Sequence, residues 1–349
     1  MKIMIDIGHP AHVHYFRTFY REMSTAGHEF LITARDKEMS HALLNGYGIP
    51  FVSRGAGANS ALGKLLYLPR ANMILLREAR RFRPDVFLSF SSPYAAQVSA
   101  LVRRPHIAFD DTEHAKLGRF MYAPFTDVVL SPSSYRGKPM RNQVLFKGSL
   151  ELLYLHPRVF TPDPIVLGSA GVQRGEPYSF LRFVSWNANH DIGASGMTLE
   201  NKRRAVRELE KLGKVLISSE AELPADLSGY RIEVDPTLVH HLLHFASVSI
   251  GESATMASES AVVGTPAIYM DRTGRGYTDE LERRYGLVYN FSDSPSDQVS
   301  AIEKACALLS DPEAAERHAR GRDAFLAASV DVNATLLDTV RSTVAAHLS

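Results

Sequence analysis

The sequence predicts an α/β protein with two Rossmann-like domains that face a central cleft. Two observations lead to this prediction. Short apolar runs, each long enough for a buried strand, alternate with helix-like segments from the first residues onward, which is typical of parallel sheets covered by helices on both faces. The alternation stops in a stretch rich in proline and glycine at 156–178 and then restarts, which indicates a crossing between two domains.

Composition narrows the class of protein. A chain of 349 residues with 45% hydrophobic and 22% charged residues is typical of a globular protein with two domains of ordinary size. The net charge of +1 gives no indication of a nucleic-acid partner. Cys306 is the single cysteine, which excludes a disulfide framework within the chain and a cysteine-rich metal site and favours a reducing compartment. We find no signal peptide and no run near the roughly 18 apolar residues of a membrane span, so we expect a cytoplasmic protein.

The first domain is expected at 1–155. The run "KIMIDI" predicts a buried strand, and Phe16, Phe19, Tyr20 and Met23 recur at helical spacing before a glycine. In chain order, the expected strands are 2–7, 28–34, 49–53 and 85–90, followed by one in "RRPHIAFD" and one in "TDVVLS", and the expected helices are 14–27, 37–48 and 64–83.

The second domain is expected at 179–330, followed by a carboxyl-terminal helix at 331–349 that is a candidate to pack back on the first domain. Its expected strands are 180–186, 214–219, 247–250 and 266–270, its expected helices are 199–212, 236–245 and 255–263, and the tail is helical from 295 onward. In such an arrangement the carboxyl ends of the strands of both sheets point at one ligand.

The stretch "SIGESATMASESAVVGTPAIYMD" carries the clearest functional pattern. A strand ends at Ile250, a "GES" turn follows, and a helix begins near Ala254. The first turn of such a helix offers backbone N–H groups and the positive end of the helix dipole to a diphosphate. Ser253 is placed to cap the helix and contact a phosphate oxygen, and Glu259 to accept hydrogen bonds from ribose hydroxyls. The expected ligand contacts are Gly251, Glu252, Ser253, Ala254, Thr255, Met256 and Glu259. The alternative is an ordinary capped helix with a solvated glutamate.

The stretch "DIGHPAHVHYF" places three histidines, His9, His12 and His14, just after the first strand. The His-x-His spacing suits a metal-dependent hydrolase, but a barrel enzyme of that type needs more histidines and an aspartate at later strand ends. The pattern therefore favours a loop at Gly8 that offers backbone N–H groups to a ligand, with His9 or His12 as the acid–base group and His14 at the start of the helix. No metal is expected.

A group of acidic residues follows another expected strand in "FDDTEHAK". Asp110, Asp111 and Glu113 lie at the carboxyl end of that strand, where carboxylates are well placed to act as general bases. The alternative is a capping box that opens a short helix.

Further candidate ligand contacts lie in the second domain. The polar loop of "FVSWNANHDIG" follows its first strand, "ISSE" ends the next strand, and "DPTLVHHLLHFA" is expected to be helical. The candidates for contact with phosphate, sugar or base are Ser185, Asn187, His190, Asp191, Ser218 and His240. For the loop the alternative is a structural turn, and for His240 it is a place on the helix surface.

These motifs together resemble a known group of proteins. A strand, a Gly/Ser turn, a serine, five residues, a glutamate and a closing "GTP" are similar to the nucleotide-sugar motif of GT-B glycosyltransferases and UDP-N-acetylglucosamine 2-epimerases. With "GHPAHVHYF…AGHEFLITAR", 105–115 and "SWNANHD", the chain resembles the domain of unknown function 354 family, which is regarded as GT-B-like. The resemblance implies that Ser253 contacts the diphosphate and Glu259 the ribose. It also implies that the first domain is the acceptor side and the second binds the nucleotide sugar.

The function that this resemblance implies is sugar transfer from a nucleoside-diphosphate donor, expected to be uridine-based, to a sugar or lipid-linked acceptor in polysaccharide or glycolipid assembly. In this fold the leaving diphosphate is stabilised without a required metal, and no cofactor is expected. One alternative is a 2-epimerase of a UDP-N-acetylhexosamine that uses Asp110, Asp111 and Glu113. Another is a protein that binds the nucleotide sugar without catalysis.

The segment 61–84 combines arginines with leucines and contains a single acidic residue, Glu78. A basic amphipathic helix of this kind is a candidate to lie on an anionic membrane surface, which would make the protein peripheral to the inner membrane face. The alternative is a helix that packs on the sheet of its own domain.

Overall fold

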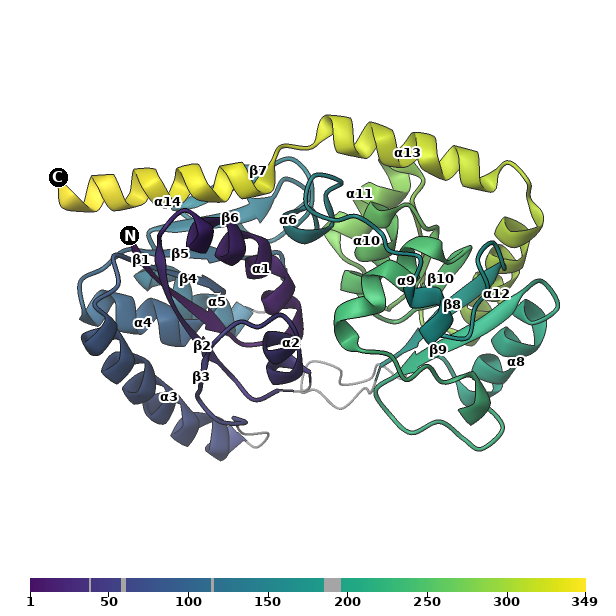
Figure 1. Cartoon of the computed structure of the whole chain (residues 1–349), viewed down its shortest axis with the longest axis horizontal. Helices are drawn as coiled ribbons and strands as arrows, with labels where there is room; N and C mark the ends of the chain where they lie inside the picture. The colour runs from purple at the N-terminus through teal and green to yellow at the C-terminus, as the bar shows by residue number, and fades with distance from the viewer. Residues whose placement is uncertain (38, 58–60, 114–115, 185–195) are drawn as a thin grey trace. The chain divides into compact units, whose positions relative to one another are not determined.

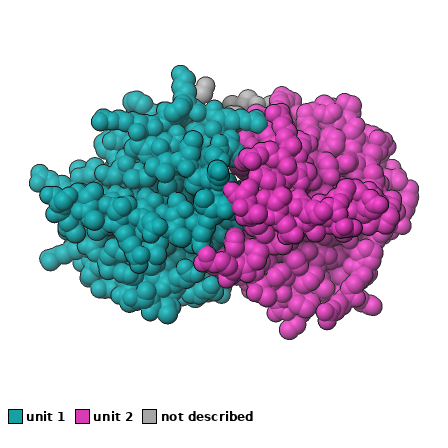
Figure 2. All heavy atoms as spheres, turned by 90° about the horizontal axis from the view of Figure 1, so that it is seen from above, with its two compact units in different colours: residues 1–154, 329–349 teal, residues 155–328 magenta. Residues whose placement is uncertain are grey.

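The structure, a computed structural model of the whole chain, describes all residues except 38, 58–60, 114–115 and 185–195 (Figure 1). The chain forms two compact units, coloured teal and magenta in Figure 2. Unit 1 comprises Met1–Tyr154 and Ser329–Ser349, and unit 2 comprises Leu155–Ala328. The proline- and glycine-rich stretch 156–178 falls within unit 2, and the end of the chain belongs to unit 1.

Unit 1 is built on a seven-stranded sheet in the order β3-β2-β1-β4-β5-β6-β7, and every pair of neighbouring strands is parallel. The strands are β1 (Lys2–Ile7), β2 (Glu29–Ala34), β3 (Val52–Ser53), β4 (Val86–Phe90), β5 (His106–Phe109), β6 (Val128–Pro132) and β7 (Gln143–Phe146). The order runs from β1 outward through β2 and β3 on one side and continues from β4 to β7 on the other. The point where the order reverses therefore lies between β1 and β4.

Helices cover both faces of this sheet (Figure 1). They are α1 (Pro10–Thr25), α2 (Ser40–Gly46), α3 (Ala61–Phe82), α4 (Pro93–Leu101), α5 (Lys116–Tyr122), α6 (Leu152–Leu155) and α14 (Val332–Leu348), with a short 3-10 turn η1 (Ala123–Phe125). Because parallel crossovers are right-handed, α1 and α2 lie on one face and α3, α4 and α5 on the other. The core on the second face packs Met4 and Phe87 of the sheet against Leu75 of α3 and Val98 of α4.

The first helix begins earlier than the sequence indicated. α1 starts at Pro10 and not at His14, because His9 caps it: the His9 ring accepts a hydrogen bond from the Ala11 N–H, and Pro10 takes the first helical position, where no N–H is needed. His14 therefore lies inside the helix and is 7% exposed. Its ring stacks on Tyr154 and its Nδ1 lies 3.3 Å from the Tyr47 hydroxyl.

Unit 2 is built on a five-stranded sheet in the order β12-β11-β10-β8-β9, again with all neighbours parallel. Its strands are β8 (Tyr178–Phe183), β9 (Lys214–Ser219), β10 (Val248–Gly251), β11 (Ala267–Met270) and β12 (Val288–Phe291). Its helices are α7 (Val166–Ser169), α8 (Leu199–Leu209), α9 (Val239–Phe245), α10 (Ala254–Val263), α11 (Gly276–Tyr285), α12 (Pro295–Ser310) and α13 (Ala314–Ala328), with 3-10 turns η2 (Ser228–Tyr230) and η3 (Pro236–Leu238). The order reverses between β8 and β10.

A hydrophobic core of unit 2 lies on the face of its sheet that carries α8 and α12, where Leu181 and Ile250 pack with Leu209 and Ile302. The other face carries α9, α10 and α11. The prediction of an α/β fold with two parallel sheets is confirmed. Among the described residues, no helix is both long enough and apolar enough to cross a membrane.

Candidate functional sites

Each unit presents one candidate site at the carboxyl edge of its own sheet. In open α/β sheets, ligands bind outside the carboxyl ends of the strands, at the point where the strand order reverses. In unit 1 this point is flanked by the start of α1, which carries His9 as its cap and His12 in its first turn, and by the turn after β4. In unit 2 it is flanked by the chain after β8 and by the amino end of α10.

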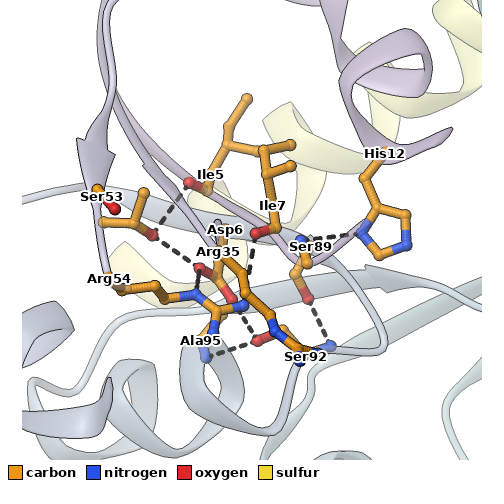
Figure 3. A network of polar contacts seen from close by, with 12 residues as sticks. Ile5, Asp6, Ile7, His12, Arg35, Ser53, Arg54, Ser89, Ser92 and Ala95 are labelled. Carbon is orange, nitrogen blue, oxygen red and sulfur yellow. Dashed lines mark hydrogen bonds and ion pairs between the residues drawn. The ribbon is translucent and has the colours of Figure 1, made fainter. Parts of the chain in front are cut away.

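A buried ion pair lies beneath the unit 1 site (Figure 3). Asp6 on β1 and Arg54, just after β3, are 1% and 2% exposed, and Arg54 Nε donates to Asp6 Oδ1 over 2.9 Å. The hydroxyls of Thr33 and Ser92 also donate to the Asp6 carboxylate. The Tyr67 hydroxyl accepts from Arg54 Nη1 at 2.7 Å. Both charges are thus paired and hydrogen-bonded, as burial requires.

The ion pair connects the strands on both sides of the reversal point. In the sheet register Asp6 lies beside Thr33 of β2 and beside Ser89 of β4. The Ser92 hydroxyl that donates to Asp6 also accepts from the Ala95 N–H and caps α4. Sequence reasoning missed this pair, although an aspartate inside the apolar run "KIMIDI" was a signal that β1 needs a buried partner for its charge.

His9 and His12, at the start of α1, accept hydrogen bonds from backbone N–H groups through their ring nitrogens. Gly8 N–H donates to His12 Nδ1 over 3.2 Å, and Ala11 N–H donates to His9 Nδ1. A neutral imidazole that accepts through Nδ1 carries its proton on Nε2. Burial, and then the nearby charges of His9, Lys37 and Arg54, hold the pKa of His12 well below its usual value, so this ring is neutral near pH 7. In this tautomer Nε2 of His12 carries the ring proton and can donate a hydrogen bond.

The acidic group after β5 is arranged around buried oxygens. The carboxylate of Asp110, which is 2% exposed, accepts from the Tyr122 hydroxyl and from the Thr112 N–H. Burial raises the pKa of Asp110. Burial and the neighbouring carboxylates of Glu151 and Asp110 raise the pKa of Asp111 to about 8. Asp111 is therefore mostly protonated at pH 7 and exchanges its proton close to neutrality.

Two further points concern the acidic group: the contact of Glu113 and the turn that follows Asp110. Glu113 accepts a hydrogen bond from the Arg136 N–H at 3.4 Å. The Thr112 N–H bond to Asp110 forms a local turn, which gives Asp110 a structural role in addition to any chemical one. This turn is not the expected capping box, because α5 begins only at Lys116. His114 lies outside the described residues.

In unit 2 the amino end of α10 has the expected local structure. Ser253 caps the helix, with its hydroxyl accepting from the Met256 N–H, and Gly264 closes it at a φ of 103°. Gly251 brings β10 close to β8, because a Cβ at this position would lie 2.9 Å from the Arg182 carbonyl oxygen. Ala254, Thr255 and Met256, in the first turn, are partly exposed.

A small pocket, partly open to solvent and with room for about one water molecule, lies between this helix end and the sheet. It is lined by residues of β8, β10 and α10, among them Phe180, Arg182, Ser249, Gly251, Ser253 and Met256. Arg182 is a cation that sequence reasoning missed. Its guanidinium donates to Ser218, at the end of β9, and to Glu220. The helix amino end suits an anionic ligand, while the charge of the neighbouring Arg182 is paired with the Glu220 carboxylate.

Two glutamates of this region make protein contacts that differ from the expectation. Glu252 was expected to bind the ligand, but it is 4% exposed and its carboxylate accepts from the backbone N–H groups of Val184 and Met197. Glu259 is not solvated: it is 5% exposed and its Oε1 lies 2.9 Å from His240 Nε2. His240 is correspondingly buried and does not lie on the helix surface.

The expected contacts Ser185, Asn187, His190 and Asp191 lie outside the described residues.

Metal ligation finds no support in the described part of the chain. No group of three histidine, cysteine or acidic side chains is placed to hold a metal ion among the described residues, which leave out 38, 58–60, 114–115 and 185–195. The hydrolase alternative also required a closed barrel, whereas the strands described here form two open sheets.

Comparison with known proteins finds a family that resembles the first part of the chain. Residues 1–155 match the family described as "Protein of unknown function (DUF354)". Over this part, which is 155 of the 349 residues, the chain resembles that family. It is also 24% identical over 284 residues to the uncharacterized protein MJ0665 of Methanocaldococcus jannaschii, an alignment that covers 77% of this chain and 81% of that protein.

Solved structures show which fold this chain has. A UDP-GlcNAc 2-epimerase from Neisseria meningitidis bound to UDP-GlcNAc has a TM-score of 0.69 at 14% identity, with 97% of this chain and 100% of that chain covered. The spinosyn rhamnosyltransferase SpnG complexed with thymidine diphosphate has a TM-score of 0.63 at 15% identity, with 97% and 99% covered. The chain thus has the GT-B-like fold that glycosyltransferases and UDP-GlcNAc 2-epimerases share.

Proposed function

We propose that the protein is a GT-B-type glycosyltransferase that transfers a sugar from a nucleoside-diphosphate donor, with UDP as the nucleotide, to an acceptor bound by unit 1. The observation that carries the proposal is the amino end of α10 with its pocket, at the point where the unit 2 sheet reverses its strand order. Backbone N–H groups and the helix dipole at such a place suit a diphosphate.

In the proposed reaction the acceptor hydroxyl loses its proton to a carboxylate of unit 1, and its oxygen forms a bond to the anomeric carbon of the donor sugar. The bond from that carbon to the diphosphate breaks, and the electron pair leaves with the nucleoside diphosphate. The proposed base is the ionised form of Asp111, which is the minor form at pH 7 and becomes more abundant as the pH approaches its pKa of about 8. His12 donates from Nε2 to a substrate oxygen, and the first turn of α10 stabilises the leaving diphosphate.

A charge placed in the first turn of α10 gives a sharp test of the donor site. Thr255→Glu puts a carboxylate where a helix favours one, so the fold is retained, but that carboxylate repels a diphosphate. Thr255→Gln is the uncharged control of the same size. With UDP at about 100 times its dissociation constant, the melting temperature of the wild type should rise by roughly 5–10 °C. Thr255→Gln should keep most of this shift and Thr255→Glu should lose it. Equal shifts in all three proteins would remove the basis of the assignment.

A second candidate function is a 2-epimerase of a UDP-N-acetylhexosamine, and the acidic group of unit 1 favours it. Asp111 is protonated near pH 7, and Asp110, Glu113 and Glu151 lie in the same group, so an acid and bases are available for proton exchange at a sugar carbon. Incubation of donor with enzyme in D₂O separates the two functions. An epimerase incorporates deuterium at C2 without an acceptor, whereas a transferase leaves C2 unlabelled. A protein that binds UDP and shows neither activity with any acceptor would be a binding protein.

A further inference from the structure

The outer surface of α3 carries a stripe of arginines. Arg70, Met73, Arg77 and Arg80 are exposed and follow one another at spacings of three and four residues, which places them along one side of the helix. The opposite side, with Leu75 and its neighbours, packs on the sheet. The leucines that suggested membrane contact in the sequence are therefore partly used in the core, and the outward stripe consists of cations around Met73, which is 67% exposed.

The helices next to α3 continue the same layer. A chain of hydrogen bonds crosses it: Asn72 of α3 donates to the side chain of Gln97 on α4, and Gln97 donates to the carbonyl of Met121 on α5. These contacts place α3, α4 and α5 side by side on one face of the unit 1 sheet, at the level of Met73 and Phe120. The three helices are labelled in Figure 1.

α5 adds large apolar side chains to this surface. Leu117 and Phe120 lie three residues apart, on one side of the helix, and are 75% and 77% exposed. Leu101, at the end of α4, is 67% exposed. Apolar side chains exposed to this degree, in the same layer as a row of arginines, form a surface that the core of the unit does not use.

We propose that this face of unit 1 docks on an anionic lipid bilayer. The basic–apolar face is defined by Arg70, Met73, Arg77, Arg80, Leu117 and Phe120. Charge complementarity favours lipid as the occupant: the stripe carries cations, while Glu78, the acidic residue of α3, is turned inward with 10% of its side chain exposed and pairs with Arg77. Arginines bind anionic headgroups, and the Leu117 and Phe120 side chains enter the boundary between headgroups and acyl chains.

The docked orientation has a consequence for the substrate. α5 follows Asp110, Asp111 and Glu113 closely in the chain, so docking of α5 brings this acidic group to the lipid surface. Resting on the proposed function, this makes a lipid-linked acceptor the class of substrate that unit 1 receives. Docking itself needs neither nucleotide nor turnover, so its test is separate from the test of transfer.

Co-sedimentation of the full-length protein with lipid vesicles tests the docking. One vesicle population contains phosphatidylcholine alone, and the other contains phosphatidylcholine mixed with anionic phosphatidylglycerol. The wild type should bind the anionic vesicles, and high salt should release it, because surface charge interactions are screened. Each arginine near an anionic surface contributes roughly a fivefold change in the partition coefficient, so Arg70→Ser with Arg80→Ser should weaken binding by about 25-fold. Leu117→Ser with Phe120→Ser should weaken it by at least tenfold.

Matched variants on unit 2 serve as controls. Arg174→Ser with Arg283→Ser removes the same charge from exposed positions, and Ile165→Ser removes an apolar side chain that is 82% exposed. Both controls should bind vesicles like the wild type, and all variants should keep the response of the melting temperature to UDP. Failure of the wild type to bind anionic vesicles would overturn the proposal, and so would equal losses in the controls. Self-association that Leu117→Ser with Phe120→Ser abolishes, without vesicle binding, would identify a second copy of the chain as the occupant.

Discussion

The carboxyl edges of the two sheets hold charge in different ways. In unit 1, carboxyl groups are buried beneath the edge and bound by other side chains: Asp6 by the Arg54 guanidinium, and Asp110 by the Tyr122 hydroxyl. In unit 2, the groups that face an anion at this edge are backbone N–H groups. The first turn of α10 presents N–H groups at the pocket, and the carboxylate of Glu252 is bound by the N–H groups of Val184 and Met197.

This difference corresponds to two kinds of chemistry. Side chains can change protonation, and burial next to other charges moves their pKa toward neutrality, as at Asp111. Backbone N–H groups cannot change protonation, but they hold an anion with a fixed geometry. We therefore interpret the unit 1 edge as suited to proton transfer and the unit 2 edge as suited to holding a charged leaving group. Perturbing each edge in turn tests the comparison.

The largest effect is expected from Arg54→Met, which leaves the Asp6 carboxylate buried without its cation. Removing one partner of a buried ion pair typically lowers the unfolding free energy by about 3–5 kcal/mol. Hydrogen–deuterium exchange followed by mass spectrometry should show faster exchange of the β1 and β4 amides, with β10 unchanged. The exposed Arg21→Met, on the same unit, is the control and should cost less than about 0.5 kcal/mol.

The double variant Asp6→Asn with Arg54→Met distinguishes a charge effect from a packing effect. Removal of both charges leaves no uncompensated ion, so the double variant should be more stable than Arg54→Met alone. If Arg54→Met proved as stable as Arg21→Met, buried charge would not be the feature that distinguishes the edge of unit 1.

Asp111 should make the stability of unit 1 depend on pH. Its pKa is raised from 3.8 to about 8 in the folded state, so the folded protein holds a proton that the unfolded chain releases above about pH 4. Stability from this group is therefore present at low pH and is lost as the pH rises through the window from about 4 to 8. Relative to the wild type, Asp111→Asn should gain roughly 2–4 kcal/mol at pH 8 compared with pH 5.

Urea unfolding at the two pH values measures this difference, with the exposed Glu22→Gln as the control. Other groups titrate in the same range, and the comparison of variant with wild type removes their contribution. His12, whose pKa is lowered by burial, acts in the opposite direction, because its stability contribution grows as the pH rises. A parallel pH dependence in the wild type and Asp111→Asn would mean that Asp111 is ionised at neutral pH and is not a group matched to proton transfer there.

Features that depend on local sequence were predictable. The alternation of strands and helices, the turn after β10, the Ser253 cap and the closing Gly264 all depend on neighbouring residues, and the structure has each of them. Features that depend on register or on distant partners were not. Asp6 meets Arg54 across a separation of 48 residues, and nothing in "GES" indicates that Glu252 will bind Val184 and Met197.

The histidines show the same limit. In "LVHHLLHF" the helical period alone cannot say which ring is buried, and the partner of His240 is Glu259 on another helix. The start of α1 was placed four residues too late because histidine is an uncommon cap. The roles of these rings follow from their partners, which only the folded chain brings together.

The smallest of these effects is expected at Glu252, and it tests the unit 2 side of the comparison. A carboxylate accepts from two N–H groups at once, whereas the amide of Glu252→Gln accepts through its oxygen and turns an NH₂ group toward the second donor. One of the Val184 and Met197 N–H groups is then left without its acceptor, at a cost of about 2 kcal/mol. The exposed Glu222→Gln removes the same charge from unit 2 and should have little effect.

Val184 directly follows β8, at the carboxyl edge of the unit 2 sheet. Glu252→Gln should therefore also weaken UDP binding, while hydrogen–deuterium exchange of the β1 amides stays unchanged. Normal UDP affinity in a destabilised Glu252→Gln protein would show that the backbone held by Glu252 takes no part in the anion site, and that α10 alone forms it.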